Sequence, residues 1–274
     1  MAVVAIAREI GTAGTQVGQA LSRRLGCPLL TREIVLEAAR RYDVAPDKLA
    51  DVDEHAPSFW QRFDRERRRH LVFLRAALLD RIAGGACIVI GRVAPLLLLD
   101  VPPVLRARIT APRAVRVRRL MAENGIEEAA AQGQIDAYER ELEAQAQALF
   151  GLDWREPTHY DVVLSTGRLG IEECAAVLAR STDTATHRPT PATRACLRDH
   201  AVAACVHAAL ARERGLGALG VTVRAADGHV TITAATIGPA FAERVRGIAA
   251  CVEGVREVTC VSEAPVPIPP VERL

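Results

Sequence analysis

The strongest constraint on the fold is an alternation of short apolar runs and longer helical patterns over the first 180 residues. Runs of this length with apolar interiors are typical of strands buried on both faces, and intervening helices carry the chain from one parallel strand to the next. We therefore predict an α/β domain with a parallel sheet covered by helices on both faces. The predicted strands are 3–6, 87–90, 105–110 and 162–164, and the predicted helices are 15–25, 32–42, 59–82, 113–123, 127–149 and 171–179.

The composition changes after residue 180. The segment 181–191 reads STDTATHRPTP, which is polar, carries two prolines and has no period, so we predict a linker at 183–193. We place one domain at 1–182 and a second at 194–263, followed by a Pro-rich tail at 264–274. The second domain is predicted as a small α+β fold with helices at 194–214 and 239–252 and strands at 221–225, 230–234 and 255–261.

Two turn signals support this second domain. Asp227-Gly228 lies between two alternating runs and is typical of a hairpin whose turn requires positive φ. Gly254 follows the last predicted helix, and we expect it to be the C-cap glycine.

Charge and cysteine content exclude several classes of protein. The net charge is only +2, which argues against a dedicated nucleic-acid binder. The seven cysteines contain no C-x-x-C pair, and their odd number favours a reducing compartment. The chain opens without the pattern of a signal peptide, and no apolar run approaches 18 residues. We expect a cytoplasmic protein with no membrane span.

The turn after the first strand is the leading candidate for a binding site. It reads Arg8-Glu9-Ile10-Gly11-Thr12-Ala13-Gly14-Thr15, and a helix follows. Glycines let the backbone approach a phosphate, and the helix N-terminus carries partial positive charge. The motif G-x-x-x-x-G-K-[ST] is not matched, because Lys48 is the only lysine of the chain and lies far beyond the loop. From these residues alone, a phosphate loop and an ordinary strand–helix turn remain alternatives.

Four stretches in order resemble the cytidylate kinase-like family, relatives of cytidylate kinase that typically lack the loop lysine. The resemblance covers about residues 1–180. Its motifs are Ala7-Arg8-Glu9-Ile10-Gly11-Thr12-Ala13-Gly14, then Val89-Ile90-Gly91-Arg92, then Ala111-Pro112-Arg113 with Arg116, Arg118 and Arg119, and finally Asp136 and Arg140 with Gly151-Leu152-Asp153-Trp154, Pro157, Tyr160-Asp161 and Leu164.

The resemblance implies a P-loop fold with a helical lid, and ATP and Mg²⁺ as cofactors. Its candidate catalytic residues are Arg116, Arg119 and Arg140, since arginine forks suit phosphate oxygens. Its candidate nucleotide-binding residues are Arg8, Gly11, Thr12, Ala13, Gly14 and Thr15, and Arg92 is the candidate contact to the acceptor. No metal ligand is assigned, although the hydroxyl of Thr12 or Thr15 and the carboxylate of Asp136 are candidates for Mg²⁺.

The sequence also departs from the family pattern. Ala7 stands where serine is usual, Ala13 where glycine is usual, and Val93 where cytidylate kinases carry an aspartate that helps to hold the substrate. The segment Leu30-Thr31-Arg32-Glu33 stands where an aspartate before a lysine is common. A further basic run, Arg62 to Arg69, is either a solvated helix face or a monophosphate-binding helix.

Residues 194–263 resemble a BON domain. The resemblance rests on Val221-Thr222-Val223, on Asp227-Gly228-His229-Val230-Thr231-Ile232-Thr233, and on Val252-Glu253-Gly254-Val255-Arg256-Glu257-Val258. It implies a module that contacts lipids, hydrophobic ligands or other proteins.

The resemblance to the cytidylate kinase-like family implies a nucleoside monophosphate kinase-like enzyme that transfers a phosphoryl group from ATP to CMP or a related nucleotide. The alternative is a catalytically weak nucleotide sensor that acts through its BON-like domain. In both cases the expected ligands are nucleoside mono- and triphosphates, with no nucleic acid.

Overall fold

The computed structural model describes residues 2–31, 33–49, 65–92, 94–213 and 220–263. Within these residues the chain forms two compact units. The first comprises 2–31 and the described part of 86–189, and the second comprises 33–49, 65–85 and the described residues from 190 onward.

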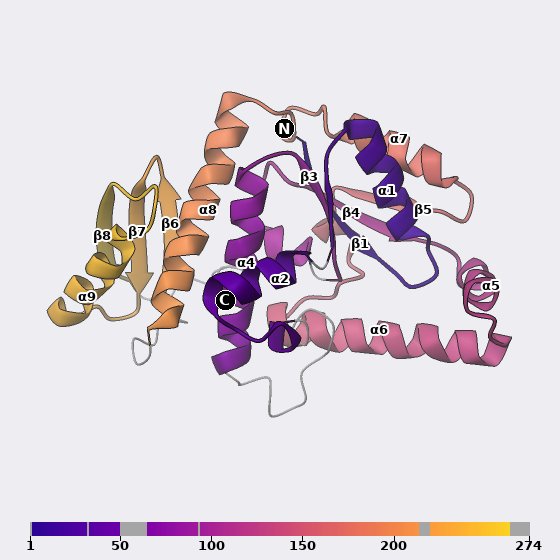
Figure 1. Ribbon diagram of the computed structural model, residues 1–274, viewed down its shortest axis with the longest axis horizontal. Coiled ribbons are helices and arrows are strands. Elements are labelled where there is room, and N and C mark those ends of the chain that lie inside the picture. Colours follow the sequence, from indigo (N-terminus) through magenta and orange to yellow (C-terminus); the bar gives the residue numbers. More distant parts are fainter. Residues whose placement is uncertain (1, 32, 50–64, 93, 214–219, 264–274) are drawn as a thin grey trace. The chain divides into compact units, whose positions relative to one another are not determined.

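The first unit is built on a five-stranded, all-parallel sheet (Figure 1). Its strands are β1 (Val3–Arg8), β2 (Leu29–Leu30), β3 (Cys87–Ile90), β4 (Leu105–Thr110) and β5 (Val162–Ser165), in the order β2-β3-β1-β4-β5. β1 therefore lies at the centre, with Val4 opposite both Ile88 and Leu105. Because β3 and β4 flank it on the two sides, the loop that follows β1 emerges at the middle of the carboxyl edge, where ligands of open α/β sheets bind.

Helices α1 (Gly14–Leu25) and α7 (Ile171–Ser181) pack against each other and cover one face of this sheet. The core on that face joins Val4, Ile6, Ile88 and Ile109 of the sheet to Val17, Leu21, Cys174 and Leu178 of the two helices. On the opposite face, Val3, Ala5 and Ala7 are also buried. Burial of both faces explains why this strand has no polar residue before Arg8.

Two helices connect β4 to β5 and correspond to the predicted lid. They are α5 (Arg113–Asn124) and α6 (Glu128–Phe150), and the 3₁₀ turn η3 (Pro157–His159) precedes β5. Val117 and Leu120 of α5 pack on Ala131 and Ile135 of α6, with Ile10 of the first loop against this cluster. Helices α5 and α6 are thus anchored to the loop by apolar packing. A second short 3₁₀ turn, η2 (Leu96–Leu98), follows β3.

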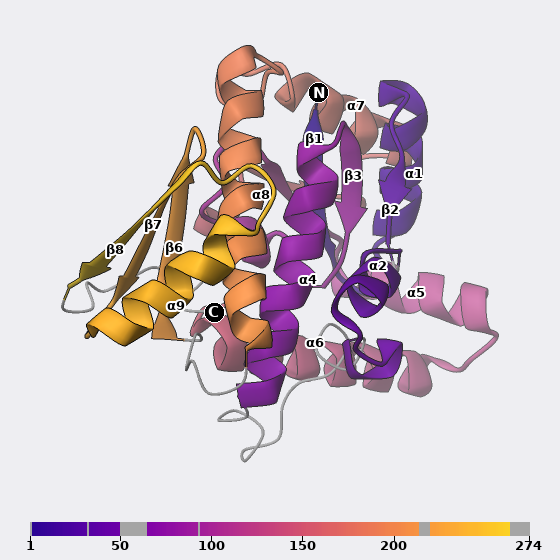
Figure 2. The same ribbon diagram turned by 60° about the vertical axis from the view of Figure 1, so that its left-hand side comes forward.

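The second unit contains α2 (Glu33–Tyr42), α4 (Arg65–Ala83), α8 (Pro191–Arg212), α9 (Pro239–Ala250) and a three-stranded sheet. Its strands β6 (Thr222–Ala226), β7 (His229–Ala234) and β8 (Glu257–Ser262) pair antiparallel and then parallel. Figure 2 shows α8 between α4 and this sheet. The side chains of α8 explain this position, because Val206 and Leu210 join the core of the small sheet while Leu197, Ala201, Ala204, Ala208 and Ala211 form a separate buried stripe.

The fold class is as predicted: an α/β unit with a parallel sheet, and a small C-terminal three-stranded sheet with helices. The predicted hairpin turn is confirmed, since Asp227 and Gly228 have φ of 47° and 80°. The prediction that Gly254 is the C-cap glycine is wrong, because α9 ends at Ala250 and its C-cap residue is Cys251, which has a right-handed backbone. Gly254 instead has φ +89° in the turn before β8, where a Cβ would lie 2.9 Å from Val202 Cγ2.

Two further elements differ from the sequence expectation. The short strand β2 was not predicted, because two residues are too few to show a period. Helix α8 begins at Pro191, inside the predicted linker, with Thr190 and Thr193 forming a capping box. The predicted domain boundaries themselves remain a prediction. The predicted helical residues 59–64, the basic residue Arg62, Val93 and the tail lie outside the described residues.

Candidate functional site

In the loop after β1, most backbone amides donate no hydrogen bond to the described residues. Among the described residues, the amides of residues 10–16 donate no hydrogen bond, and the next amide, that of Val17, donates to the carbonyl of Ala13 at 3.0 Å. Gly11 (φ +75°) and Ala13 (φ +57°) both have left-handed backbones, and such alternation turns successive amides toward one concave side. The loop therefore has the backbone form of an anion-binding site at the start of α1.

Close packing explains the two glycines of this loop. A Cβ on Gly11 would lie 2.8 Å from the backbone oxygen of Arg116, so α5 rests directly on the loop. A Cβ on Gly14 would lie 2.6 Å from Arg8 Cβ. Only glycine fits at either position without a shift of the backbone.

The two loop threonines have different surroundings. Thr12 is buried, and its hydroxyl donates to the carbonyl of Glu9 at 2.7 Å. Thr15 is half-buried in the first turn of α1, and the structure shows no polar contact of its hydroxyl among the described residues. Thr15 is therefore the loop hydroxyl that is better placed to serve a ligand or a metal ion.

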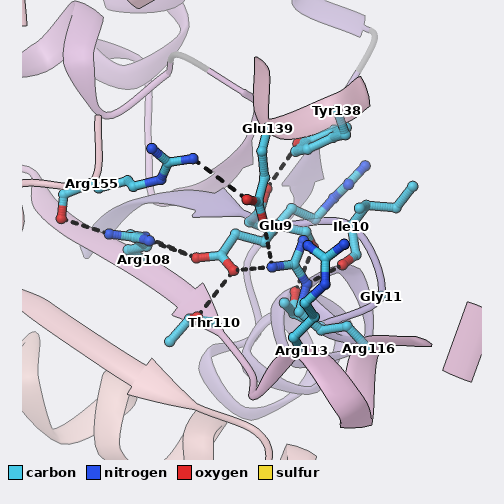
Figure 3. A network of polar contacts seen from close by, with 12 residues as sticks. Glu9, Ile10, Gly11, Arg108, Thr110, Arg113, Arg116, Tyr138, Glu139 and Arg155 are labelled. Atoms are coloured by element: carbon cyan, nitrogen blue, oxygen red, sulfur yellow. Dashed lines mark hydrogen bonds and ion pairs between the residues drawn. The ribbon is translucent and has the colours of Figure 1, made fainter. Parts of the chain in front are cut away.

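Arg116 of α5 lies against this loop and is held by three protein oxygens (Figure 3). Its Nε donates to the carbonyl of Ile10 at 2.9 Å, and its Nη1 donates to Glu9 Oε2 at 2.9 Å and to Glu139 Oε1 at 2.6 Å. The side chain is 5% exposed, and Nη2 is buried with no hydrogen-bond partner among the described residues. A buried guanidinium donor without a partner is costly, which makes this atom a candidate ligand contact.

Glu9 is the centre of this polar network. It is 4% exposed and accepts hydrogen bonds from Arg108 Nε at 3.1 Å, Arg108 Nη2 at 2.7 Å and Thr110 Oγ1 at 3.1 Å, in addition to Arg116. A buried carboxylate needs such compensation, because its desolvation costs several kcal/mol. Glu9 thus links β1 and β4 to the first helix of the predicted lid.

Glu139 of α6 approaches the same guanidinium from the lid side (Figure 3). It is 23% exposed, and its other oxygen contacts Arg155 Nη2 at 3.4 Å. Arg155 also pairs with Glu143 at 3.3 Å. Glu139 is therefore more solvated than Glu9 and less tightly held.

Arg119 of α5 contacts both the loop and Thr166, which follows β5. Its Nη1 donates to Thr166 Oγ1 at 2.8 Å and to the carbonyl of Gly11 at 3.4 Å, and its Nη2 donates to the carbonyl of Thr166 at 3.0 Å. The hydroxyl of Thr166 in turn donates to the carbonyl of Thr12 at 2.7 Å. The predicted pair Arg116 and Arg119 does share one helix face, and both side chains reach the first loop.

The other predicted arginines lie in different surroundings. Arg92 pairs with Glu141 at 3.0 Å and lies over the ring of Tyr138 at 4.3 Å. Arg140 is exposed and is not brought together with Arg116. Arg8 is half-buried, and its Nε has no partner among the described residues. Whether any of these residues contacts a nucleotide remains a prediction.

The proposed metal candidates can be compared with the described side chains. Asp136 pairs with Arg113 at 2.7 Å, and Glu9 and Glu139 pair with Arg116. Within the described residues, no group of three His, Cys, Asp or Glu could hold a metal ion by itself. The arrangement fits the anionic part of a nucleotide, with Thr15 as the side chain that could add a hydroxyl ligand to a metal bound on the phosphates.

Sequence reasoning missed Glu9, Arg108, Thr110, Tyr138, Glu139, Arg155 and Thr166. One signal for two of them, Arg108 and Thr110, is the alternation in β4, where they share with Arg106 the face opposite the apolar core. Polar side chains on a covered face need partners. Arg106 forms an ion pair with Asp161 at 2.8 Å, and Arg108 and Thr110 donate hydrogen bonds to Glu9.

Burial changes the pKa of several tyrosine and cysteine side chains. Burial raises the pKa of Tyr160 to about 12, and its hydroxyl donates to the carbonyl of Trp154 at 2.7 Å. Burial also raises the pKa of the Cys27, Cys174 and Cys205 thiols. All seven cysteines are free, and the raised pKa of these three thiols disfavours the nucleophilic thiolate form.

Comparison with known proteins decides the family. Residues 3–168 match the model of the cytidylate kinase-like family, and this range includes the first loop and helices α5 and α6. The chain belongs to the cytidylate kinase-like family.

Among three similar proteins, only the first supports the fold, through its TM-score above 0.5. A solved structure of an uncharacterized protein from Eubacterium ventriosum covers 66% of this chain and 98% of its own, with 20% identity and a TM-score of 0.52. A shikimate kinase from Bacteroides thetaiotaomicron covers 67% and 99%, with 16% identity and a TM-score of 0.41. A uronate isomerase from Corynebacterium glutamicum is 33% identical over 96 residues, which are 35% of this chain and 18% of that protein.

No helix among the described residues of this family member is long and apolar enough to cross a membrane.

Proposed function

We propose that the chain is a nucleoside monophosphate kinase-like enzyme that transfers the γ-phosphoryl group of ATP to CMP or a related nucleotide. The observation that carries the proposal is the first loop, whose amides from residue 10 to residue 16 have no partner among the described residues and which lies against Arg116. The family match over residues 3–168 supports the same reading.

The chemistry needs positioning and positive charge more than a reactive side chain. The loop amides and the start of α1 would hold the phosphates, and Arg116 and Arg119 would place guanidinium groups beside them. Mg²⁺ would supply charge on the phosphate oxygens, with Thr15 as the candidate hydroxyl ligand. Arg92, which follows β3 at the carboxyl edge of the sheet, is the proposed contact to the acceptor, and Arg140 is a further candidate on α6.

The alternative function is a nucleotide sensor that binds but transfers poorly. It is favoured by the missing loop lysine, because the only lysine, Lys48, pairs with Glu66 at 3.8 Å in the second unit. It is also favoured by the two carboxylates that neutralise Arg116. In that case the output would pass through the C-terminal segment.

We further propose that residues 194–263 form a BON-like interaction module in a cytoplasmic protein. The segment supplies two helices and a three-stranded sheet with its own apolar core, which includes Val221, Val230, Ile232 and Val245. Its partner would be a lipid, a hydrophobic ligand or another protein.

A coupled phosphoryl-transfer assay over a panel of nucleoside monophosphates, with and without Mg²⁺, tests the proposal. We expect ATP-dependent and Mg²⁺-dependent transfer with a preference for a pyrimidine monophosphate. Binding of ATP without transfer to any acceptor would contradict the enzyme and leave the sensor.

A further inference from the structure

The two carboxylates on Arg116 are not equivalent. Glu9 lies on the central strand side, is 4% exposed and has three hydrogen bonds from Arg108 and Thr110 besides the one from Arg116. Glu139 lies on α6, is 23% exposed and has only Arg155 as a further partner among the described residues. Removing Glu9 from the network would leave a buried charge uncompensated, whereas Glu139 can turn toward water.

The charges of the inner network balance only while Glu139 is present. Two carboxylates, Glu9 and Glu139, face two guanidinium groups, Arg108 and Arg116. When Glu139 leaves, one positive charge remains in excess beside the loop. A phosphate oxygen supplies the same charge and the same hydrogen-bond acceptors as a carboxylate, and arginine binds both in similar geometry.

The side chains around Glu139 allow it to move away from Arg116. Arg155 is 41% exposed and already contacts both Glu139 and Glu143, so it can keep Glu139 paired in a new position. The Nη2 atom of Arg116 has no partner among the described residues, so the guanidinium has an unused donor for a ligand besides the one that Glu139 would free.

On the basis of the proposed function, we propose that Glu139 occupies Arg116 until a nucleotide phosphate displaces it. Glu139 competes with the phosphate, so the apparent affinity for nucleotide is reduced by the fraction of molecules in which the Arg116–Glu139 pair is closed.

The test compares Glu139→Gln with Glu143→Gln in the full-length chain. Both variants remove one carboxylate from α6 and from a contact with Arg155, but only the first removes a contact with Arg116. We expect isothermal titration with ATP, ADP or tripolyphosphate to give a roughly tenfold lower Kd for Glu139→Gln, and a Kd within about twofold of wild type for Glu143→Gln. Melting curves of all variants check that the fold is retained.

A second background isolates the arginine. In Arg116→Ala, the gain from Glu139→Gln should disappear, because the proposed competition acts through this guanidinium. A gain that persists in this background, or an equal gain in Glu143→Gln, would show a general charge effect and overturn the inference. The proposed function would stand in both of those cases, whereas the absence of binding to every variant would overturn the proposed function itself.

Discussion

Ala13 has a backbone conformation that is unfavourable for any residue with a Cβ. Its φ of 57° and ψ of 25° place it in the left-handed region at the N-cap of α1. We predict that Ala13→Gly stabilises the protein by about 0.5–1 kcal/mol, because relief of strain outweighs the added freedom of the unfolded chain. Urea unfolding of Ala13→Gly beside Ala13→Val checks this, since the branched side chain should be destabilising. A lower stability of the glycine variant would contradict the assigned conformation.

A variant of Arg116 can show whether this residue acts in nucleotide binding or in phosphoryl transfer. If its charge acts on the transferred phosphoryl group, Arg116→Ala should lower kcat by roughly 10²-fold while weakening ATP binding less. Arg118→Ala is the matched control, because Arg118 is exposed on the same helix. Steady-state kinetics beside equilibrium binding provide the measurement, and Arg140→Ala can be assayed in the same series. Equal losses of binding and turnover in Arg116→Ala would assign it to ground-state binding.

Asp161 gives a pH-dependent prediction. Burial alone would raise the pKa of this carboxyl, but the hydrogen bonds and charge of Arg106 outweigh burial and hold the pKa below its usual value. The pair therefore stabilises the fold above about pH 4 and loses this contribution as the pH falls through the lowered pKa. Asp161→Asn should cost about 1–2 kcal/mol at pH 7 and progressively less in more acidic solution.

Urea unfolding of wild type and Asp161→Asn from pH 7 down to pH 3 measures this difference. Glu123→Gln, at an exposed position on α5, is the control and should follow wild type throughout. A difference that stays constant as the pH falls would mean that the Asp161 charge contributes nothing to stability.

Among the helices and strands, sequence periodicity placed the central strands and the helices within a few residues, except for the start of the helix predicted at 59–82, which lies outside the described residues. The strands 87–90 and 105–110 were predicted at their observed bounds, because the first is a short apolar run and the second alternates apolar and polar residues. The site was harder to predict. Glu9 was visible only as part of a motif, because its partners Arg108, Thr110 and Arg116 lie about 100 residues away and only the parallel pairing of β1 with β4 brings them together.

The buried stripe of helix α8 can be tested by overpacking. This stripe, which is mostly alanine with spacings of four and three, allows close approach of the neighbouring α4, whose residues 71–79 are buried except for Arg75. Ala208 is fully buried, so we predict that Ala208→Leu costs about 1–3 kcal/mol through overpacking. Ala209→Leu, at a half-buried position on the same helix, should cost less. Thermal unfolding of both variants provides the comparison, and equal costs would contradict the stripe as a packing surface.

At the scale of the whole molecule, the predicted boundary and the compact units can be tested together. We predict that limited proteolysis first cuts between Ser181 and Arg194, the polar segment that runs from the end of α7 into the first turn of α8. Since α4 and α8 pack against each other within the second unit, the two fragments should stay together after cleavage. Gel filtration of the nicked protein checks this. Separation of the fragments would contradict the packing of α8 on α4, and early cuts within the strands of the first sheet would contradict the predicted domain.

We propose that the loop after β1 binds the phosphates of a nucleotide. Calorimetric titration with ATP and ADP, each with and without Mg²⁺, followed by hydrogen exchange of the complex, tests it most directly. We predict binding in the micromolar to millimolar range and slower exchange of the amides from Gly11 to Gly18, which have few or no partners in the free loop. No heat with any nucleotide, or binding that leaves exchange in this segment unchanged, would contradict the claim.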